Sequence, residues 1–498
     1  MQFNYLSTIV FLPLVGAILI ALIPKLSEKS IKILAVNFTL ASLVIAIFAF
    51  FYFDRSIGAA IFQFEEKAAW IPAIKANFYL GVDGISLPMV VLTAFLGLMV
   101  VLISWKIHLR VREYFAWLLL LETSILGVFT SLDLLLFFVF WEIEIIPMYF
   151  LISIWGSGRK EYSSIKYVIF TLFGSALMLA GILSVYISTG TLDMVELASK
   201  GLAMAQTFIP ASAIFFLLLT GFAVKLPVFP LHTWLPDAHT DAPTAGSVML
   251  AGALIKMGGY GIIRVVSFFP DIAKQYAMFL LALAVISVLY GAALTLRQKD
   301  LKRMIAYSSV SHMGFVLLGV FALGQISMTG AALQMVSHGL LTGLMFAMAG
   351  LTIHNVEERN LDKLGGLARQ MPVVAVVFSI AGLGSLGLPT TSGFAAEFIT
   401  FVGAFSSTVV ANIQAFTLLA VIGVVLAAGY ILWLIQRTFY GPVREEYNKV
   451  KDADTLERIY MIAFVALIML VGIYPAILTD VIRMGIAPIA NFFGSGGM

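Results

Sequence analysis

The sequence predicts an all-α, polytopic membrane protein with about fourteen transmembrane helices. Three observations lead to this prediction: the composition, the length of the apolar runs and the distribution of basic residues. Of the 498 residues, 61% are hydrophobic and 11% are charged, whereas a soluble chain is usually about 45–50% apolar and about 25% charged. The excess apolar surface needs a lipid bilayer as its solvent.

A membrane-spanning helix needs about 20 mainly apolar residues. Such runs fall approximately at 5–24, 31–53, 83–105, 114–131, 133–156, 164–188, 208–229, 243–266, 275–296, 302–323, 327–353, 371–388 with a continuation to 407, 411–436 and 459–480. The longest polar stretches between them are 54–82, 189–207, 354–370 and 437–458. The first run lacks a basic segment before it and a cleavage site after it, so we expect it to be retained as a span.

The basic residues follow the alternation that fourteen spans require. When successive loops are assigned to alternate sides, 21 of the 30 Lys and Arg residues fall on one side and 7 on the other. The remaining two, Lys225 and Lys256, lie within spans. Because cytoplasmic loops carry the excess of Lys and Arg, the first side is the cytoplasmic side. Both termini are then expected on the opposite side.

Composition also excludes several functions. The net charge of +3 and the lack of a basic tail give no footprint for nucleic acid. The chain has no cysteine, which excludes disulfides and cysteine-ligated iron–sulfur clusters. The run from Gly382 to Gly387 fits a dinucleotide-binding pattern, but it lies in an apolar helical run without a preceding strand. We expect no cofactor and no metal in this chain.

Two carboxylates lie in the fifth span, at Glu142 and Glu144. A charge at the bilayer centre costs at least ~2.5–3.5 kcal/mol, so it persists where it faces a bundle interior or water. In a continuous helix, positions i and i+2 are about 200° apart, so the two carboxylates would face nearly opposite sides. One ion path is therefore not expected to use both equally.

The seventh span holds Lys225, followed by Pro227 and Pro230. Each proline removes a helical hydrogen bond, which should free the carbonyls of Ala223 and Leu226. Lipid cannot satisfy these groups, so water or protein must do so. A lysine beside such a break is well placed to load and release a proton.

A polar cluster follows at His232, Asp237, His239 and Asp241. Two histidines and two aspartates within ten residues could form a metal site. A funnel for proton uptake at the cytoplasmic mouth of the seventh span explains the cluster as well. Because Pro236 lies between the histidines, they are not expected to share one face of a regular helix.

Four further ionisable residues lie in later spans: Lys256, His312, His338 and Glu397. A lone membrane histidine is often a hydrogen-bonded packing residue, but two histidines between a buried lysine and a buried glutamate make a plausible relay. Pro389 precedes Glu397 and should break the twelfth span as the prolines break the seventh. Interruptions at corresponding places in two halves are typical of an inverted repeat.

These residues carry a resemblance to a known family. Trp141-Glu142…Ile146-Pro147, the run from Lys225 to His239 and the run from Ala245 to Lys256 resemble the antiporter-like subunits of respiratory complex I and of Mrp-type cation/proton antiporters. Within that family the chain is most similar to the subunit M type, which is called chain 4 in mitochondria and has a counterpart in photosynthetic relatives. Glu397 matches this type, whereas other members usually have lysine at that position. The chain also ends too soon for the long lateral helix of the subunit L type.

The resemblance implies two inverted five-helix repeats, with broken helices 7 and 12. The segments would be 1–110 for helices 1–3, 111–268 for the first repeat, 269–440 for the second and 441–498 for helix 14 and the tail. It also implies roles: Glu142 pairs with Lys225, and Lys256 passes a proton through the two histidines to Glu397. Glu144, His232, Asp237 and His239 would be secondary.

The resemblance further implies that flavin, iron–sulfur clusters and the quinone site belong to other subunits. The expected partners are the L-like and N-like antiporter subunits, in a bacterial plasma membrane or a thylakoid membrane. Two alternatives stay open from the residues alone. One is an Mrp-type cation/proton antiporter subunit without redox partners, and the other is a scaffold whose buried charges only lock helices together.

Overall fold

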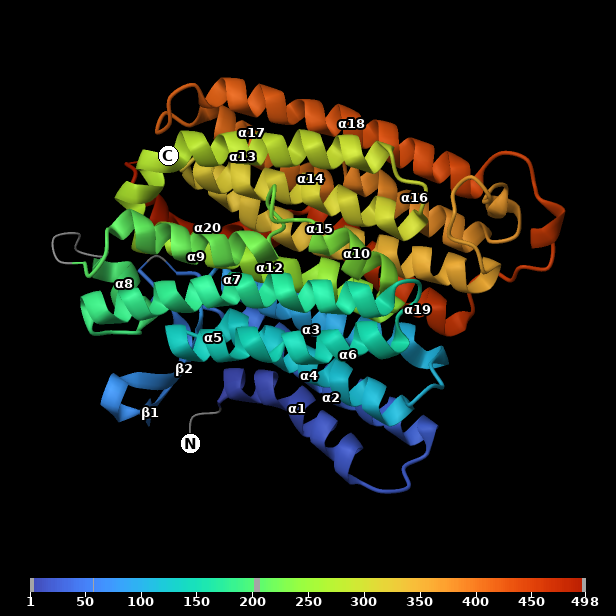
Figure 1. The fold of residues 1–498 in the computed structure, drawn as a ribbon, viewed down its shortest axis with the longest axis horizontal. Coiled ribbons are helices and arrows are strands. Elements are labelled where there is room, and N and C mark those ends of the chain that lie inside the picture. Colours follow the sequence, from blue (N-terminus) through green and yellow to red (C-terminus); the bar gives the residue numbers. More distant parts are fainter. Residues whose placement is uncertain (1–3, 57, 201–206, 495–498) are drawn as a thin grey trace.

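The fold is a bundle of long helices that lie side by side along a common direction (Figure 1). The structure is a computed structural model that describes residues 4–56, 58–200 and 207–494. Residues 201–206 of the polar stretch 189–207, and the outermost residues of the first and last predicted segments, lie outside the described residues. Twelve described helical segments are long and apolar enough to cross a membrane. Two of these segments, Leu134–Trp155 and Thr244–Phe268, each consist of successive shorter helices. The predicted helical membrane fold is thereby confirmed.

The N-terminal part and the first predicted repeat contain twelve α-helices among the described residues. They are α1 (Tyr5–Leu22), α2 (Glu28–Tyr52), α3 (Ser86–Ile103), α4 (Val111–Thr130), α5 (Leu134–Ile143), α6 (Ile145–Trp155), α7 (Lys160–Thr189), α8 (Met194–Lys200), α9 (Ala211–Lys225), α10 (Trp234–Asp241), α11 (Thr244–Met249) and α12 (Ile255–Phe268). A single turn of π-helix, η4 (Leu250–Leu254), joins α11 to α12.

The remaining α-helices among the described residues are α13 (Pro270–Leu296), α14 (Leu301–Phe321), α15 (Gln325–Val356), α16 (Pro372–Ser385), α17 (Ser392–Ser406), α18 (Ile413–Phe439), α19 (Thr455–Ile473) and α20 (Ala476–Asn491). Short 3-10 segments cover Pro72–Ile74, Ser104–Lys106, Leu367–Arg369 and Glu445–Tyr447.

The seventh and twelfth predicted spans correspond to shorter helices. The run 208–229 contains α9, of 15 residues, and the run 371–407 contains α16 and α17, of 14 and 15 residues. These three are apolar but shorter than the twelve long helices. The total of fourteen spans, their interpretation as broken spans and the division into two inverted repeats stay predictions.

Helices α9 and α16 end in the same way. In α9, the Leu226 amide donates to the Phe222 carbonyl and the Val228 amide donates to the Ala223 carbonyl. In α16, the Leu386 amide donates to the Gly382 carbonyl and the Leu388 amide donates to the Leu383 carbonyl. The two bonds span four and five residues in both helices. The intervening residues, Pro227 and Gly387, both have positive φ. The prediction that Pro227 leaves the Ala223 carbonyl free was wrong, because the Val228 amide takes it.

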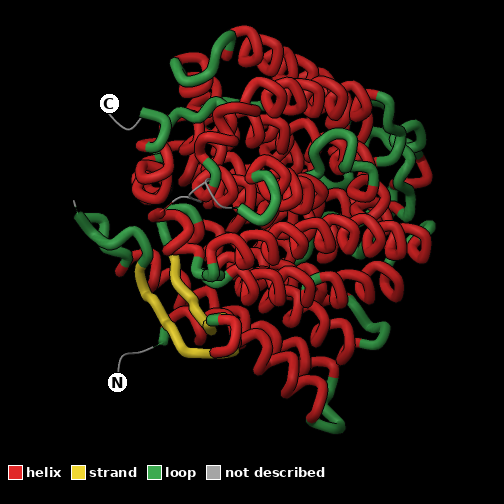
Figure 2. Tube along the Cα trace, turned by 60° about the vertical axis from the view of Figure 1, so that its left-hand side comes forward, coloured by secondary structure: helices red, strands yellow, loops and turns green. Residues whose placement is uncertain are grey.

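A β-hairpin lies within the polar stretch 54–82, which was expected from the sequence only as a connection. Its strands are β1 (Gln63–Ile71) and β2 (Ala76–Val82), which pair antiparallel from Gln63 opposite Val82 to Ile71 opposite Ala76. The hairpin protrudes beside the helices (Figure 2). It lies at the same end of the bundle as α8 and both labelled termini (Figure 1).

Close packing of α9 on α12 depends on a glycine. A Cβ atom added at Gly258 would lie 2.5 Å from the Leu226 amide nitrogen and 2.6 Å from the Phe222 carbonyl oxygen. Both are backbone atoms, which cannot move aside without moving the helix. The end of α9, including Lys225, is thereby held directly against α12.

Gly258→Ala is expected to lower the stability of the folded bundle by about 1–3 kcal/mol, the usual cost of overpacking a dense interior. Gly429→Ala is the matched control, because that glycine is also helical and nothing lies within 4 Å of its added Cβ. Thermal unfolding of the two purified variants in detergent, followed by circular dichroism, measures the difference. Equal unfolding temperatures would contradict the packing argument.

Candidate functional site

The first cluster of buried ionisable groups centres on Lys225, the last residue of α9. Its ammonium group donates to Oε1 of Glu144, and both side chains are almost completely buried. The hydroxyl of Tyr167 on α7 donates to the other oxygen of Glu144 at 2.7 Å. The rings of Trp141 and Tyr167 lie 5.3 and 5.4 Å from the ammonium nitrogen, within range of a cation–π attraction. Lys225 is therefore held by one carboxylate and two aromatic rings.

This pairing corrects the expectation that Glu142 bonds to Lys225 and that Glu144 points away. The helix is locally irregular here, since α5 ends at Ile143 and α6 begins at Ile145, but Glu144 keeps the right-handed helical values of φ −65° and ψ −25°. Helical spacing separates the two carboxylates without saying which of them faces Lys225, and the choice of Glu142 came from the resemblance. Glu142 still lies within electrostatic range of Lys225, and its buried Oε1 has no hydrogen-bond partner among the described residues.

The second cluster begins at Lys256, the second residue after the π-helix. Its ammonium group donates to the carbonyl of Ala251, five residues earlier, and lies 2.8 Å from Nδ1 of His338 on α15. A π-helical turn shifts the carbonyl pairing by one residue. The Lys256 side chain uses a carbonyl that this shift makes available, and none of the residue's surface is exposed.

The two histidines connect this lysine to Glu397. The rings of His338 and His312 have their centroids 5.7 Å apart. Nδ1 of His312 lies 3.1 Å from Oε1 of Glu397 on α17, and all three residues are buried. Gln334 donates to the same carboxylate oxygen at 3.4 Å. The structure thus brings together Lys256, His338, His312 and Glu397, four residues named from the sequence.

Several partners in these clusters were not identified from the sequence. Nε2 of His312 lies 3.2 Å from the hydroxyl of Ser385 and 3.2 Å from that of Tyr430, and Tyr167 binds Glu144. Nothing in the sequence marks these hydroxyls, because they come from distant helices. Glu122 was also missed; it is buried in the middle of α4, and its Oε1 has no hydrogen-bond partner in the described part of the chain. It carries a signal that could have been used, a single carboxylate in an apolar run.

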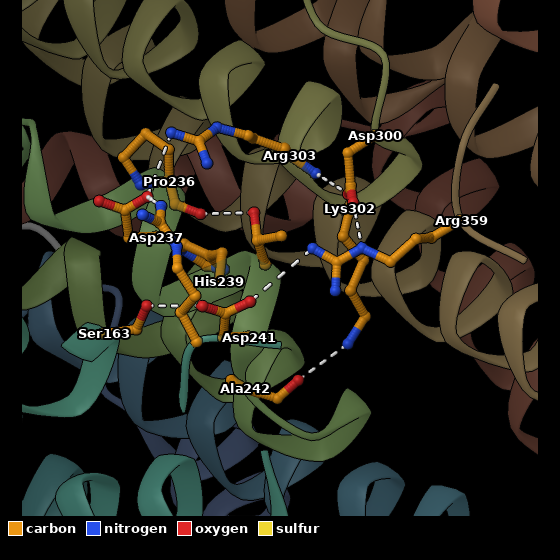
Figure 3. Close-up of polar contacts among 12 residues, drawn as sticks. Ser163, Pro236, Asp237, His239, Asp241, Ala242, Asp300, Lys302, Arg303 and Arg359 are labelled. Atoms are coloured by element: carbon orange, nitrogen blue, oxygen red, sulfur yellow. Dashed lines mark hydrogen bonds and ion pairs between the residues drawn. The ribbon is translucent and has the colours of Figure 1, made fainter. Parts of the chain in front are cut away.

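The end of α10 that is predicted to face the cytoplasm carries a network of charged residues, the cytoplasmic network (Figure 3). Asp237 lies 2.7 Å from the ammonium of Lys166 and 3.1 Å from the guanidinium of Arg303. Asp241 lies 3.7 Å from the guanidinium of Arg359. These basic residues come from three loops or helices assigned to the cytoplasmic side. Among the described residues, no group of three metal-ligating side chains occurs, and the two aspartates face basic groups instead.

The two histidines of this region do not bond to the aspartates. His239 is fully buried and stacks on Phe346 with ring centroids 4.9 Å apart, and neither of its nitrogens has a hydrogen-bond partner in the described part of the chain. It lies within electrostatic range of both Lys256 and Lys302. His232 packs against aromatic rings, with Nδ1 unpartnered among the described residues. His239 therefore lies between the charged cytoplasmic network and the Lys256 cluster.

Taken together, the geometry defines a polytopic membrane protein with ionisable side chains aligned through its interior. The family model described as NADH:quinone oxidoreductase/Mrp antiporter, TM, matches residues 131–423, more than half of the chain. The chain belongs to this family. The resemblance inferred from the motifs is confirmed.

Individual relatives cover nearly the whole chain. Subunit M of the NADH-quinone oxidoreductase of Rhodobacter capsulatus is 38% identical, over 97% of this chain and 96% of its own. The NAD(P)H-quinone oxidoreductase chain 4 1 of Synechococcus elongatus is 38% identical, over 96% and 90%. A chain of respiratory complex I from Thermus thermophilus superposes with a TM-score of 0.87 at 28% identity, over 99% and 100%. The Mrp complex of Dietzia has a chain with the same fold, with a TM-score of 0.85 at 20% identity and over 99% of both chains.

Glu144→Gln is expected to destabilise the protein more than Glu142→Gln. Breaking a buried ion pair leaves an uncompensated charge and typically costs about 3–5 kcal/mol, and Glu144 is the carboxylate that bonds to Lys225. Thermal unfolding of both variants in detergent measures the difference. Combining Glu144→Gln with Lys225→Gln should recover much of the loss. A larger cost for Glu142→Gln would show that the pairing is the reverse.

Proposed function

We propose that this chain is a proton-translocating subunit of the membrane arm of a complex I-type assembly, which couples quinone reduction elsewhere in the complex to proton movement. The observation that carries the proposal is the buried series Lys256, His338, His312 and Glu397, in which Lys256 contacts His338, the two imidazole rings lie next to each other, and His312 contacts Glu397. The full-length similarity to subunit M and chain 4 proteins supports the same assignment.

The proposed path starts at the charged cytoplasmic network. His232, Asp237 and His239 take part in proton uptake, and Lys256 passes the proton on through the two histidines. Histidine suits this task, because one ring nitrogen can accept a proton while the other donates one. Glu397 is the terminal carrier, and Ser385 and Tyr430 orient the His312 ring that it faces.

The Lys225 pair acts as the control element of the first half. Opposite unit charges ~4 Å apart interact by ~4 kcal/mol at an effective dielectric of about 20, against ~1 kcal/mol in water. A displacement of Glu144 or Glu142 would therefore change how strongly Lys225 holds its proton. The end of α9 touches α12 at Gly258, two residues after Lys256, so such a change acts at short range on the second cluster.

The assembly supplies what this chain does not provide. We place flavin, iron–sulfur clusters and the quinone site in partner subunits, and we expect L-like and N-like antiporter subunits as neighbours. The relatives come from bacteria, cyanobacteria among them, so the membrane is a bacterial plasma membrane or a thylakoid membrane.

An Mrp-type antiporter subunit is the second candidate, since the family description includes both classes. Glu397 favours the first candidate, because antiporter homologues generally have lysine there. Purification of the native assembly separates the two. Flavin- and iron–sulfur-bearing subunits that copurify with the chain support the complex I assignment, and an assembly without them would support the antiporter.

Glu397→Gln and Lys225→Ala are expected to reduce coupled proton pumping to background, because the first removes the terminal proton carrier and the second removes the control element. Glu397→Lys should retain part of the activity. Pumping by proteoliposomes containing the intact complex is measured with a pH-sensitive dye, next to the rate of quinone reduction. Wild-type pumping in Glu397→Gln or Lys225→Ala would refute the proposal. A scaffold role predicts instead that the complex fails to assemble, which native gel electrophoresis detects.

A further inference from the structure

A second charged residue, Arg264, shares the helix face of Lys256. Lys256, Tyr260 and Arg264 follow one another at intervals of four residues on α12, so they lie along one side of the helix. Arg264 is about 12 Å further along the axis, at ~1.5 Å per residue, toward the opposite side of the membrane. In the sequence-based count, Arg264 was one of the seven basic residues placed in the loops of that side. In the structure it lies within α12 and is only 5% exposed.

The guanidinium of Arg264 is held in a fixed position. Nη1 donates to Oδ2 of Asp83 at 2.7 Å, and Nη2 donates to the hydroxyl of Tyr260 at 3.0 Å. The rings of Tyr260 and Phe62 lie 4.7 and 5.4 Å from the guanidinium carbon. Oδ1 of Asp83 accepts the amides of Ile85 and Ser86 at the start of α3, so the carboxylate is anchored as well. The Nε group has no partner among the described residues.

Arg264 and Asp83 line a cavity of about 400 Å³ between the hairpin, α8, α12 and α20. The cavity reaches the surface of the opposite side, because two of its lining residues, Ile61 and Phe492, are 48% and 47% exposed. Glu65 also lines it and is bonded by the hydroxyl of Tyr79. Burial and this bond raise the pKa of Tyr79, so its hydroxyl stays a donor to Glu65 near neutral pH. Water can therefore approach the guanidinium from the opposite side.

We propose that Arg264 is an electrostatic barrier that closes the Lys256 site to protons from the opposite side of the membrane. The inference rests on the proposed function, because it assumes that Lys256 carries protons. A guanidinium keeps its charge at physiological pH and has five donors and no acceptor, so it can neither take up a proton nor pass one on. A fixed cation in a narrow passage also repels hydronium, as arginine does in pores that exclude protons.

The position of the barrier explains why it is needed. Tyr260 lies between Arg264 and Lys256, and its hydroxyl accepts a hydrogen bond from the guanidinium. If Arg264 were neutral, water in the cavity would be separated from Lys256 by this one tyrosine along the face of α12. Protons driven by the membrane potential would then return through the site instead of moving on to His338 and Glu397. Asp83 holds the cation in place and is a positioning residue.

Passive proton conductance tests the barrier without turnover. The intact complex is reconstituted in proteoliposomes, a potassium diffusion potential is imposed with valinomycin, and internal pH is followed with pyranine. Arg264→Gln should raise proton conductance about tenfold or more, which corresponds to a barrier loss of about 1.4 kcal/mol. Arg264→Lys keeps the cation and should stay near the wild-type value. Arg483→Gln, an exposed arginine on α20, is the control and should match the wild type.

Removal of both charges guards against a folding artefact. Arg264→Gln leaves Asp83 buried without its partner, whereas Arg264→Gln combined with Asp83→Asn leaves no uncompensated charge, and this double variant should leak as well. Adding Lys256→Met to Arg264→Gln should abolish the leak, because the proton then has no acceptor beyond Tyr260. Conductance at the wild-type level in both Arg264→Gln and the neutral double variant would overturn the barrier. A leak that persists with Lys256→Met would also overturn it.

The outcome is separable from that of the proposed function. A tight Arg264→Gln complex together with lost pumping in Glu397→Gln refutes the barrier and leaves the proton path standing. A leaking Arg264→Gln complex together with normal pumping in Glu397→Gln refutes the assignment of Glu397 and leaves the barrier standing.

Discussion

A bilayer offers no water to satisfy polar backbone groups, and this constraint determines where the functional residues of this bundle lie. Wherever a helix is interrupted, the released groups must find partners inside the protein. The interruptions coincide with the candidate site: Lys225 ends α9, Glu144 separates α5 from α6, and Lys256 follows the π-helix and bonds to Ala251. An ammonium at a helix C-terminus also gains from the negative end of the helix dipole. The backbone breaks and the buried charges therefore stabilise each other.

Helices α9 and α16 end in the same break but carry different chemistry there. The hydrogen bonds that end α9 and α16 match residue by residue, and this match aligns Lys225 with Ser385. In α9 the aligned side chain is a cation paired with a carboxylate, and in α16 it is a hydroxyl that binds His312. The carboxylate of Glu397 lies in α17, the helix after the second break, and faces the same histidine.

Much of this arrangement could be predicted from composition and from single residues. Buried charges stand out in apolar runs, so Lys225, Lys256, His312, His338 and Glu397 were identified as candidates. The choice between Glu142 and Glu144 failed because helical spacing shows that the two carboxylates differ in direction but not which of them faces Lys225. The hydroxyl partner Tyr430 lies 118 residues from His312. No local pattern encodes a contact of that range.

The two ends of the Lys256 cluster differ in a way that gives proton transfer a direction. Toward the predicted cytoplasmic side, the carboxylates of the network lie among long basic side chains. His239 lies between this network and Lys256, and neither of its ring nitrogens has a hydrogen-bond partner among the described residues. Toward the opposite side, the α12 face ends in Arg264, a rigidly held cation without an acceptor. On our proposal a proton can therefore reach Lys256 from the cytoplasmic network but cannot leave past Arg264. The way on leads across the bundle, through His338 and His312, to Glu397.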